Sequence, residues 1–330
     1  MTDRQSIAGR EVAATLRQMA PPSLARFPIR ARSGGIPGWV AAIPASTPTA
    51  GQSASRLLLE IPAPYDFQLS TARFRDFGSD GATVLHEGGL HRVVSGCEVR
   101  VTAADGGVAV EPWSDHAVFE IGQLLGVPFD LAPFRAWAAG DPVLGPIVEA
   151  LEGFRPTLNP QPFEALVVAI TTQQISLRAA AAIRGNLVRA YGVEHEVAWE
   201  FPTRDRIKEL RPRHFTPLGF SRAKAEYVLE LAHSSLDFAA LASLDDDEVV
   251  AALTSVRGLG RWTADWYLAR HLARPHAWPA GDLGVRKAVS TFYAGGSQLS
   301  IEEVRRMSER FAPFENLSAQ FLLAGARMAG

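Results

Sequence analysis

The segment from Leu253 to Ala264, LTSVRGLGRWTA, decides the fold expected for the chain. A helical pattern ends within it, a Gly258-x-Gly260 turn follows, and a second helical pattern begins at once. Two glycines one residue apart let the backbone turn sharply and remove side chains that would hold a polyanion away. Their amides, and those of the next helical turn, can point at a phosphate. Taken alone, such a motif is more often a tight helix–helix connection without a ligand.

Three further segments give this hairpin a context. Residues 279–282 (PAGD) end twenty positions beyond Trp262, residues 166–176 read LVVAITTQQIS, and residues 218–225 read LGFSRAKA. In order and spacing they resemble the helix-hairpin-helix plus Gly/Pro-Asp signature of the DNA glycosylase superfamily. The resemblance covers roughly residues 115–328 and is nearest to the 3-methyladenine DNA glycosylase II branch, whose members remove alkylated bases from DNA.

The N-terminal third of the chain carries strand patterns. Residues 56–61 are an apolar strand candidate, valines alternate over residues 98–102, and the alternation returns at residues 108–110 after an Asp-Gly-Gly turn. These patterns predict a small antiparallel sheet. Residues 67–69 (FQL) and 87–92 (EGGLHR) also resemble the N-terminal domain of that branch.

Helical patterns replace strand patterns after about Pro112. Apolar residues over 163–170 share one side, and steps of four continue from Ile175 to Tyr191, where Gly192 ends the helix. Further helices are expected over residues 7–19, 222–233, 246–254 (opened by an Asp245/Glu248 capping box), 263–272, 283–293, 301–311 and 317–328.

The expected fold is therefore α+β. It comprises an N-terminal antiparallel β-sheet domain with helices, followed by an all-α helix-hairpin-helix body of two subdomains that form a cleft. The expected domains are residues 1–50 (a partly irregular segment), 51–114 (the sheet), 115–160 together with 283–330 (one helical subdomain), and 161–282 (the subdomain that carries the hairpin).

Removing a base requires that its nucleotide leave the duplex, that the vacated space be filled, and that the developing sugar cation be stabilised. A carboxylate beside the sugar meets the last need and can orient the attacking water. By resemblance, Asp282 is the catalytic aspartate. An aspartate just before a helix is also an ordinary N-cap residue, so position in the motif, and not residue type, favours catalysis.

The expected base pocket is aromatic. Trp262 and Trp266 lie four residues apart on one helix face, where flat rings suit an electron-poor alkylated base, although both could equally fill the core. The resemblance also places Phe314 in the pocket, where the branch has a tryptophan, and Glu315 stands where an arginine is common. These two departures leave the substrate range open.

The remaining DNA contacts follow from the same resemblance. Gln174 is the wedge that fills the vacated stack, unless it is merely a surface glutamine. Phosphate contacts are expected from Gly258, Gly260, Thr263, Ser221 and Arg222. Seven basic residues lie between Arg204 and Lys224, so a basic surface is possible despite a net charge of −2, although a solvated helix face explains them equally well.

A missing lysine and the lack of further cysteines limit the kind of glycosylase that the chain resembles. Members that also cleave the strand carry a lysine where this chain has Trp262, so the resemblance implies a monofunctional enzyme. A single cysteine, Cys97, excludes a cysteine-ligated iron–sulfur cluster and a four-cysteine zinc site. No organic cofactor is expected. The resemblance implies one Na⁺ or K⁺ on the backbone carbonyls of Thr254, Val256 and Leu259 when DNA is bound.

Composition and partners complete the expectations. A chain of 330 residues with 47% hydrophobic and 21% charged residues reads as an intracellular globular protein. We expect a cytoplasmic, nucleoid-associated monomer that acts on double-stranded DNA containing a damaged base, with no membrane contact. The alternatives are a glycosylase for oxidised or deaminated bases and a non-catalytic helix-hairpin-helix DNA-binding protein. Asp282 separates the last of these from the enzymes.

Overall fold

A computed structural model describes residues 57–329, so the helix expected over residues 7–19 lies outside the described part. The expected antiparallel sheet is confirmed, with strand order β1-β5-β4-β3-β2. Its strands are β1 (Leu57–Glu60), β2 (Thr83–His86), β3 (Gly89–Val94), β4 (Cys97–Ala104) and β5 (Gly107–Glu111). Gly106 takes a φ of 80° in the turn between β4 and β5, as the Asp-Gly-Gly sequence predicts.

Helices make up most of the remaining structure, and none of those described is long and apolar enough to cross a membrane. They are α2 (Phe67–Asp76), α3 (Asp115–Leu124), α4 (Leu131–Ala138), α5 (Leu144–Ala150), α6 (Pro162–Thr172), α7 (Leu177–Tyr191), α8 (Arg204–Lys208), α9 (Pro212–Phe215), α10 (Arg222–His233), α11 (Phe238–Leu241), α12 (Asp246–Thr254), α13 (Arg261–Arg270), α14 (Leu283–Tyr293), α15 (Ile301–Arg306) and α16 (Glu315–Ala329), with 3₁₀ turns η1 (Thr216–Leu218) and η2 (Met307–Phe311).

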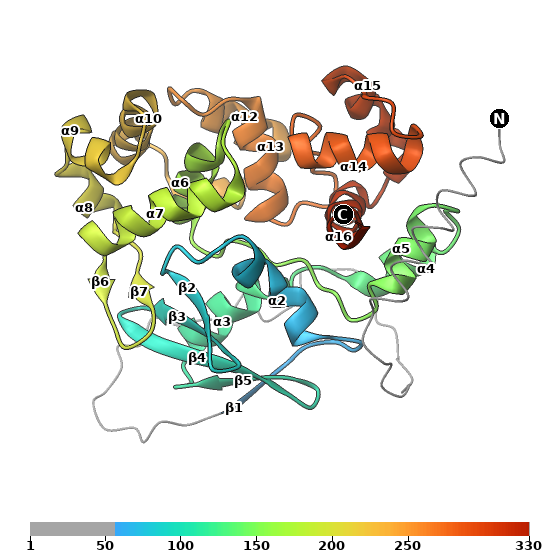
Figure 1. The fold of residues 1–330 in the computed structure, drawn as a ribbon, viewed down its shortest axis with the longest axis horizontal. Coiled ribbons are helices and arrows are strands. Elements are labelled where there is room, and N and C mark those ends of the chain that lie inside the picture. The colour runs from blue at the N-terminus through green and yellow to red at the C-terminus, as the bar shows by residue number, and fades with distance from the viewer. Residues whose placement is uncertain (1–56, 330) are drawn as a thin grey trace.

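Apolar side chains gather into three separate cores. One joins the sheet to α3 (Ile61 to Leu125), one surrounds α6, α10, α12 and α13 (Phe163 to Ala277), and one combines α4 and α5 with α14 to α16. Figure 1 shows the sheet on one side of the molecule, with α8 to α10 at one end of the helical side, α14 to α16 toward the other, and α12 and α13 between them. The α+β class is thereby confirmed.

Two segments beside the expected domain boundaries share a core with the neighbouring unit. Helix α3, assigned to a helical subdomain from residue 115 onward, instead packs its buried Ile121 and Leu124 on the sheet. Trp278 and Ala280, placed on the hairpin side of the boundary at residue 282, belong to the core of α14 and α16. The sequence does not indicate this packing, because apolar contacts between elements are not visible in the pattern of either element alone.

The helix boundaries also need corrections. The steps of four that run through Ile175 do not begin a helix there, because Ser176 caps α7 by accepting a hydrogen bond from the Ala179 N–H (3.2 Å), and Ile175 is exposed. The single helix expected over residues 301–311 is α15 followed by a 3₁₀ turn. The capping box of Asp245 and Glu248 is confirmed.

One expectation about strands was wrong. A short hairpin, β6 (Val193–Glu194) and β7 (Trp199–Glu200), follows α7, well beyond Pro112. Its loop is held by the sheet domain, because one oxygen of Glu98 accepts the N–H groups of Val197 (2.9 Å) and Ala198 (3.3 Å). Two-residue strands give too short an alternation to be recognised in a sequence.

A buried ion cluster joins the sheet to the helical body. The Arg92 guanidinium on β3 donates to Glu120 on α3 and to Glu164 on α6, each at 2.6 Å, and also to the Thr83 hydroxyl at 2.9 Å. Arg92 is only 3% exposed, and the two carboxylates are 6% exposed. Burial raises the pKa of Glu164, and the Arg92 charge opposes that rise.

Replacing Arg92 should destabilise the fold strongly. Arg92→Met leaves two carboxylates buried without a counter-charge, which should lower the free energy of unfolding by about 3–5 kcal/mol. Urea titration followed by circular dichroism measures this change. Arg100→Met, at an exposed position on the neighbouring strand, is the control and should change the value by less than about 0.5 kcal/mol. Equal effects of the two changes would contradict a structural role for the cluster.

Candidate active site

A cavity of about 1160 Å³ opens where the three cores meet. Its walls come from α2 and the following residues 77–80, from the turn between α6 and α7, from α13, from residues 279–282, and from α16. The segments that the sequence analysis singled out at the hairpin, the Gln-Gln pair and the Pro-Ala-Gly-Asp segment therefore line one space, although they lie up to about a hundred residues apart along the chain.

The expected hairpin connects α12 to α13. Its two glycines meet different structural requirements. Gly258 has a φ of 94°, and a Cβ there would lie 2.2 Å from Cγ of Tyr227, so this glycine is required by conformation and by packing. Gly260 has a φ of −94°, is exposed, and has no atom within 4 Å of the Cβ position. The backbone at Gly260 and the first turn of α13 are thus open to a ligand, with the positive end of the helix dipole behind them.

The two glutamines of the Gln-Gln pair point to different partners. The Gln173 amide donates to the Gly258 carbonyl (3.2 Å) and to the Thr263 hydroxyl (3.4 Å), which ties the α6–α7 turn to the hairpin. Gln174 is exposed at the cavity and has a φ of 60°, a left-handed conformation that is costly for a non-glycine residue. The sequence analysis identified Gln174 and missed the structural partner beside it.

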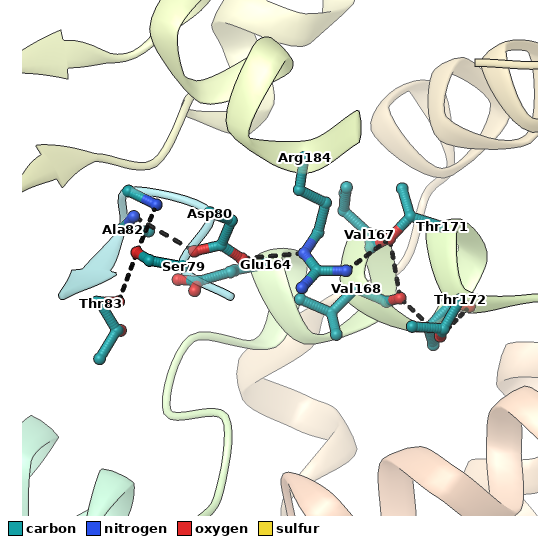
Figure 2. Close-up of polar contacts among 12 residues, drawn as sticks. Ser79, Asp80, Ala82, Thr83, Glu164, Val167, Val168, Thr171, Thr172 and Arg184 are labelled. Atoms are coloured by element: carbon teal, nitrogen blue, oxygen red, sulfur yellow. Dashed lines mark hydrogen bonds and ion pairs between the residues drawn. The ribbon is translucent and has the colours of Figure 1, made fainter. Parts of the chain in front are cut away.

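A chain of polar contacts fixes the end of α6 just before this turn (Figure 2). Arg184 on α7 pairs with Asp80 of the sheet domain (2.9 Å) and donates to the Thr171 hydroxyl (3.2 Å). Lys224 on α10 donates to the Thr171 carbonyl (2.8 Å), where a cation also complements the helix C-terminus. Two cations from different helices therefore hold the residue three positions before Gln174.

One face of α13 carries two aromatic side chains followed by a positively charged one. Trp262 and Trp266 both line the cavity, and Arg270, four residues further along the helix, continues the same face. Residues four apart share a helix face, so Arg270 was recognisable from the sequence as the next member of this row. Gly281 lies against Trp262, since a Cβ there would be 3.4 Å from the Trp262 Cδ1.

Asp282 combines the two roles that its sequence position suggested. One carboxylate oxygen, Oδ1, caps α14 by accepting the Val285 N–H at 3.0 Å. Among the residues that the structure describes, no hydrogen-bond donor is seen for Oδ2, and the half-buried side chain lines the cavity beside the tryptophans. The cap orients the carboxyl group and leaves one oxygen for chemistry.

Two predicted site residues have contacts that the sequence did not indicate. Phe314 does not line the cavity, because it packs against Phe134 and Trp137, with ring centroids 5.8 and 5.5 Å away. Thr263 is 1% exposed and Gln173 donates to its hydroxyl, which leaves the backbone of the first turn of α13, not this side chain, for a phosphate. The departure at Glu315 is a buried partner of His276 (3.1 Å).

The basic segment and the second phosphate site also receive positions. Arg204 donates to the carbonyls of Ala232, Leu236 and Ser234, and Lys224 to that of Thr171, so part of the basic segment is structural. Ser221 caps α10, and Arg222 extends from its first turn with an 87% exposed side chain. Helix α10 adjoins the hairpin through the Arg257–Glu226 ion pair (3.1 Å).

The site is thus a glycine hairpin at the mouth of an aromatic cavity in which two lining carboxylates, Asp80 and Glu164, are ion-paired and the third, Asp282, lies beside the tryptophans. A model described as the HhH-GPD superfamily base excision DNA repair protein matches residues 167–313. The matched span contains the glycine hairpin, both cavity tryptophans and Asp282.

Relatives support the same assignment. The DNA-3-methyladenine glycosylase of Bacillus subtilis is 27% identical over 222 residues, which is 64% of this chain and 73% of that protein. The 3-methyladenine DNA glycosylase of Archaeoglobus fulgidus is similar in structure, with a TM-score of 0.73, 27% identity, and coverage of 82% of this chain and 98% of that one. The Schizosaccharomyces pombe 3-methyladenine DNA glycosylase in complex with abasic DNA has a TM-score of 0.51 and 25% identity, covering 58% and 95%.

The two hairpin glycines should respond differently to alanine. Gly258→Ala should lower the free energy of unfolding by about 2 kcal/mol or more, because of its left-handed φ and the contact with Tyr227. Gly260→Ala should leave that free energy within about 0.5 kcal/mol and still weaken duplex DNA binding, because its methyl group stands before the open amides. Urea unfolding and fluorescence anisotropy measure the two effects. Unchanged DNA affinity for Gly260→Ala would show that the hairpin does not bind the backbone.

Proposed function

We propose that this protein is a monofunctional DNA glycosylase that hydrolyses the bond between an alkylated base and its sugar in duplex DNA. One observation carries the proposal: the free oxygen of Asp282 lies in an aromatic cavity whose rim includes the open amide backbone of the hairpin. The carboxylate can then meet a sugar while the neighbouring phosphate is bound. The relatives named as 3-methyladenine glycosylases support the alkylated substrate class.

The chemistry follows from what each group can do. Breaking the bond between C1′ and the base nitrogen leaves positive charge on the sugar, which the Asp282 carboxylate stabilises at short range. The same oxygen orients water, whose oxygen bonds to C1′ while its proton passes to the carboxylate. The electron pair of the broken bond leaves with the base. Trp262 and Trp266 hold the extruded base by stacking.

The strand is held by the rim of the cavity. Gly260 and the first turn of α13 receive a phosphate, and Ser221 with Arg222 offers a second contact at the start of α10. Gln174 enters the space that the flipped nucleotide leaves, and its amide can hydrogen-bond an orphaned base. Gln174 has a strained, left-handed backbone, and Arg184 and Lys224 hold the nearby Thr171 by hydrogen bonds. Both observations support this role.

The bound cation, the cofactor requirement, the oligomeric state and the location are proposals as well. We propose that one Na⁺ or K⁺ binds the carbonyls of Thr254, Val256 and Leu259 when DNA is present, where it would offset phosphate charge. The Val256 carbonyl accepts the Leu259 N–H (3.1 Å), and a carbonyl oxygen has a second lone pair for a cation. We propose no organic cofactor, a monomeric state, and a cytoplasmic, nucleoid-associated location.

Asp282→Asn should abolish base release. The amide retains the cap on α14 but carries no charge, so release from methylated duplex DNA should fall at least about 100-fold while DNA affinity and folding persist. Strand breakage after mild alkali measures the abasic sites. The control is Asp237→Asn, at the N-cap of α11 outside the cavity. If the native chain binds DNA and releases no base, the protein is a binding module instead.

The reaction should leave the strand intact. Without a lysine in place of Trp262, no Schiff base forms with the sugar, so borohydride should trap no covalent protein–DNA adduct. Breaks should appear only after alkali treatment. A trapped adduct, or breaks without alkali, would show a bifunctional enzyme. Denaturing electrophoresis of end-labelled DNA distinguishes these products.

A further inference from the structure

One edge of α14 lines the cavity with exposed side chains. Leu283, Lys287 and Thr291 all contribute to the cavity wall, and all three are exposed. They follow one another at steps of four residues, so they share one face of the helix. We call them the α14 strip. Because side chains that line a cavity and are also exposed lie at its mouth, the strip is part of the rim.

The strip and the two proposed phosphate sites lie on different parts of the rim. The hairpin and the start of α10 belong to the core around α6, α10, α12 and α13, whereas α14 shares a core with α4, α5 and α16. Figure 1 shows α10 and α14 on opposite sides of α13. A nucleotide that enters the cavity therefore has the hairpin on one side and the α14 strip on the other.

Lys287 is the charged member of the strip, and its amine has no carboxylate within 4.0 Å among residues 57–329. The other two lysines of the chain are both engaged. Lys208 pairs with Asp205 at 2.9 Å, and Lys224 donates to the Thr171 carbonyl at 2.8 Å. An unpaired lysine on a protein surface is ordinary by itself. At the mouth of a cavity proposed to receive a polyanion, it is a candidate phosphate ligand.

Leu283 is a second, independent sign of a binding surface at the same edge. Its side chain is 57% exposed, and a single exposed leucine needs no explanation. However, three of the seven large apolar side chains that are exposed in the described part of the chain, Leu283, Ile175 and Leu177, line this one cavity. Such a gathering of exposed apolar groups marks an interaction site. The mouth thus offers apolar contacts from the start of α7 and from α14.

The chemistry of the strip fits the backbone of a DNA strand, in which charged phosphates alternate with sugars that carry apolar carbon. An ammonium group binds phosphate as a point charge, a hydroxyl such as that of Thr291 can donate to phosphate, and a leucine can pack on sugar carbons. From Leu283 to Thr291, eight steps of 1.5 Å give about 12 Å, and a strand of duplex DNA advances about 3.4 Å per nucleotide. The strip is therefore long enough for about three nucleotides.

The strip also begins at the proposed catalytic acid. Leu283 directly follows Asp282, whose Oδ1 caps the same helix through the Val285 N–H. A sugar that reaches the other oxygen of Asp282 therefore lies beside Leu283. Lys287 is one turn, about 6 Å, further along α14, where a phosphate next to that sugar can be reached.

We propose that the α14 strip is a second DNA-backbone surface, on which Lys287 binds a phosphate of the damaged strand. This phosphate lies on the side of the flipped nucleotide opposite to the phosphate at the hairpin. The inference rests on the proposed glycosylase function and deepens it. Contacts on both sides hold the sugar of the flipped nucleotide at Asp282. Lys287 is a binding residue and takes no part in breaking the bond to the base.

The test combines protein variants with single neutral phosphates. Duplexes carry a tetrahydrofuran analogue of the abasic site and one methylphosphonate at successive positions of the damaged strand, and fluorescence anisotropy measures their affinity. At one position the native chain should lose at least about 3-fold in affinity while Lys287→Gln loses none, because its contact is already absent. That position should lie on the other side of the lesion from the one that couples to Gly260→Ala.

Salt dependence gives a second readout on the unmodified duplex. One phosphate contact contributes about 0.9 to the salt slope, so between about 50 and 200 mM salt the native affinity should fall about 3.5-fold more than that of Lys287→Gln. Lys287→Arg keeps the charge and should keep the native slope. So should the control Arg100→Gln, at an exposed position on β4 outside the cavity. Leu283→Ala should weaken binding without a change in slope.

Three other results would overturn the role of the strip. One is a native salt slope for Lys287→Gln with no coupled phosphate, and another is a coupled phosphate on the same side of the lesion as that of the hairpin. The third is slower base release by Lys287→Gln at saturating DNA with native affinity, which would place Lys287 in the chemistry. The binding measurements need no base release. A native chain that binds these duplexes and releases no base from methylated DNA would therefore overturn the proposed glycosylase function alone.

Discussion

The Arg92 guanidinium, held between the carboxylates of Glu120 and Glu164, is the contact on which the arrangement of the molecule depends. It connects the sheet to the first helix of the hairpin-bearing core. Glu164 lies near the start of α6, and α6 ends at the turn that carries Gln174. The position of that turn at the cavity is therefore set partly by a buried charge in the sheet domain. Removal of one partner from such a cluster leaves an uncompensated buried charge, which is strongly destabilising.

The site concentrates features that do not favour stability. Gln174 has a left-handed backbone, and an Asp282 oxygen has no described donor. Arg73, Arg270 and Arg327 also line the cavity, with no ion pair within 4.0 Å in the described part of the chain. Elsewhere the same chain satisfies its helix ends with ordinary caps, such as Ser176 and Asp245. Local conflict at one cavity within an otherwise consistent structure is the pattern that a functional site produces.

Local patterns predicted much of the architecture and part of the site. Glycine spacing located the hairpin, period-two valines located β4 and β5, and the residue before Leu283 was recognisable both as a cap and as a candidate acid. The packing of Phe314 on Phe134 and Trp137 could not be predicted, because its sequence neighbours do not indicate these contacts. Arg73 and Arg327 could not be predicted, since their meeting depends on how α2 and α16 approach α13, and no local pattern encodes that approach.

The sheet domain contributes directly to the cavity. Arg73 and the residues after α2 form one wall of the cavity. The cavity therefore has this wall only when the N-terminal domain is present. The helical body by itself would keep its hairpin, its tryptophans and its acid, yet it would lack that wall. One part of the cavity wall thus comes from a different module than the acid, so substitutions in the sheet domain can reshape the cavity and leave Asp282 in place.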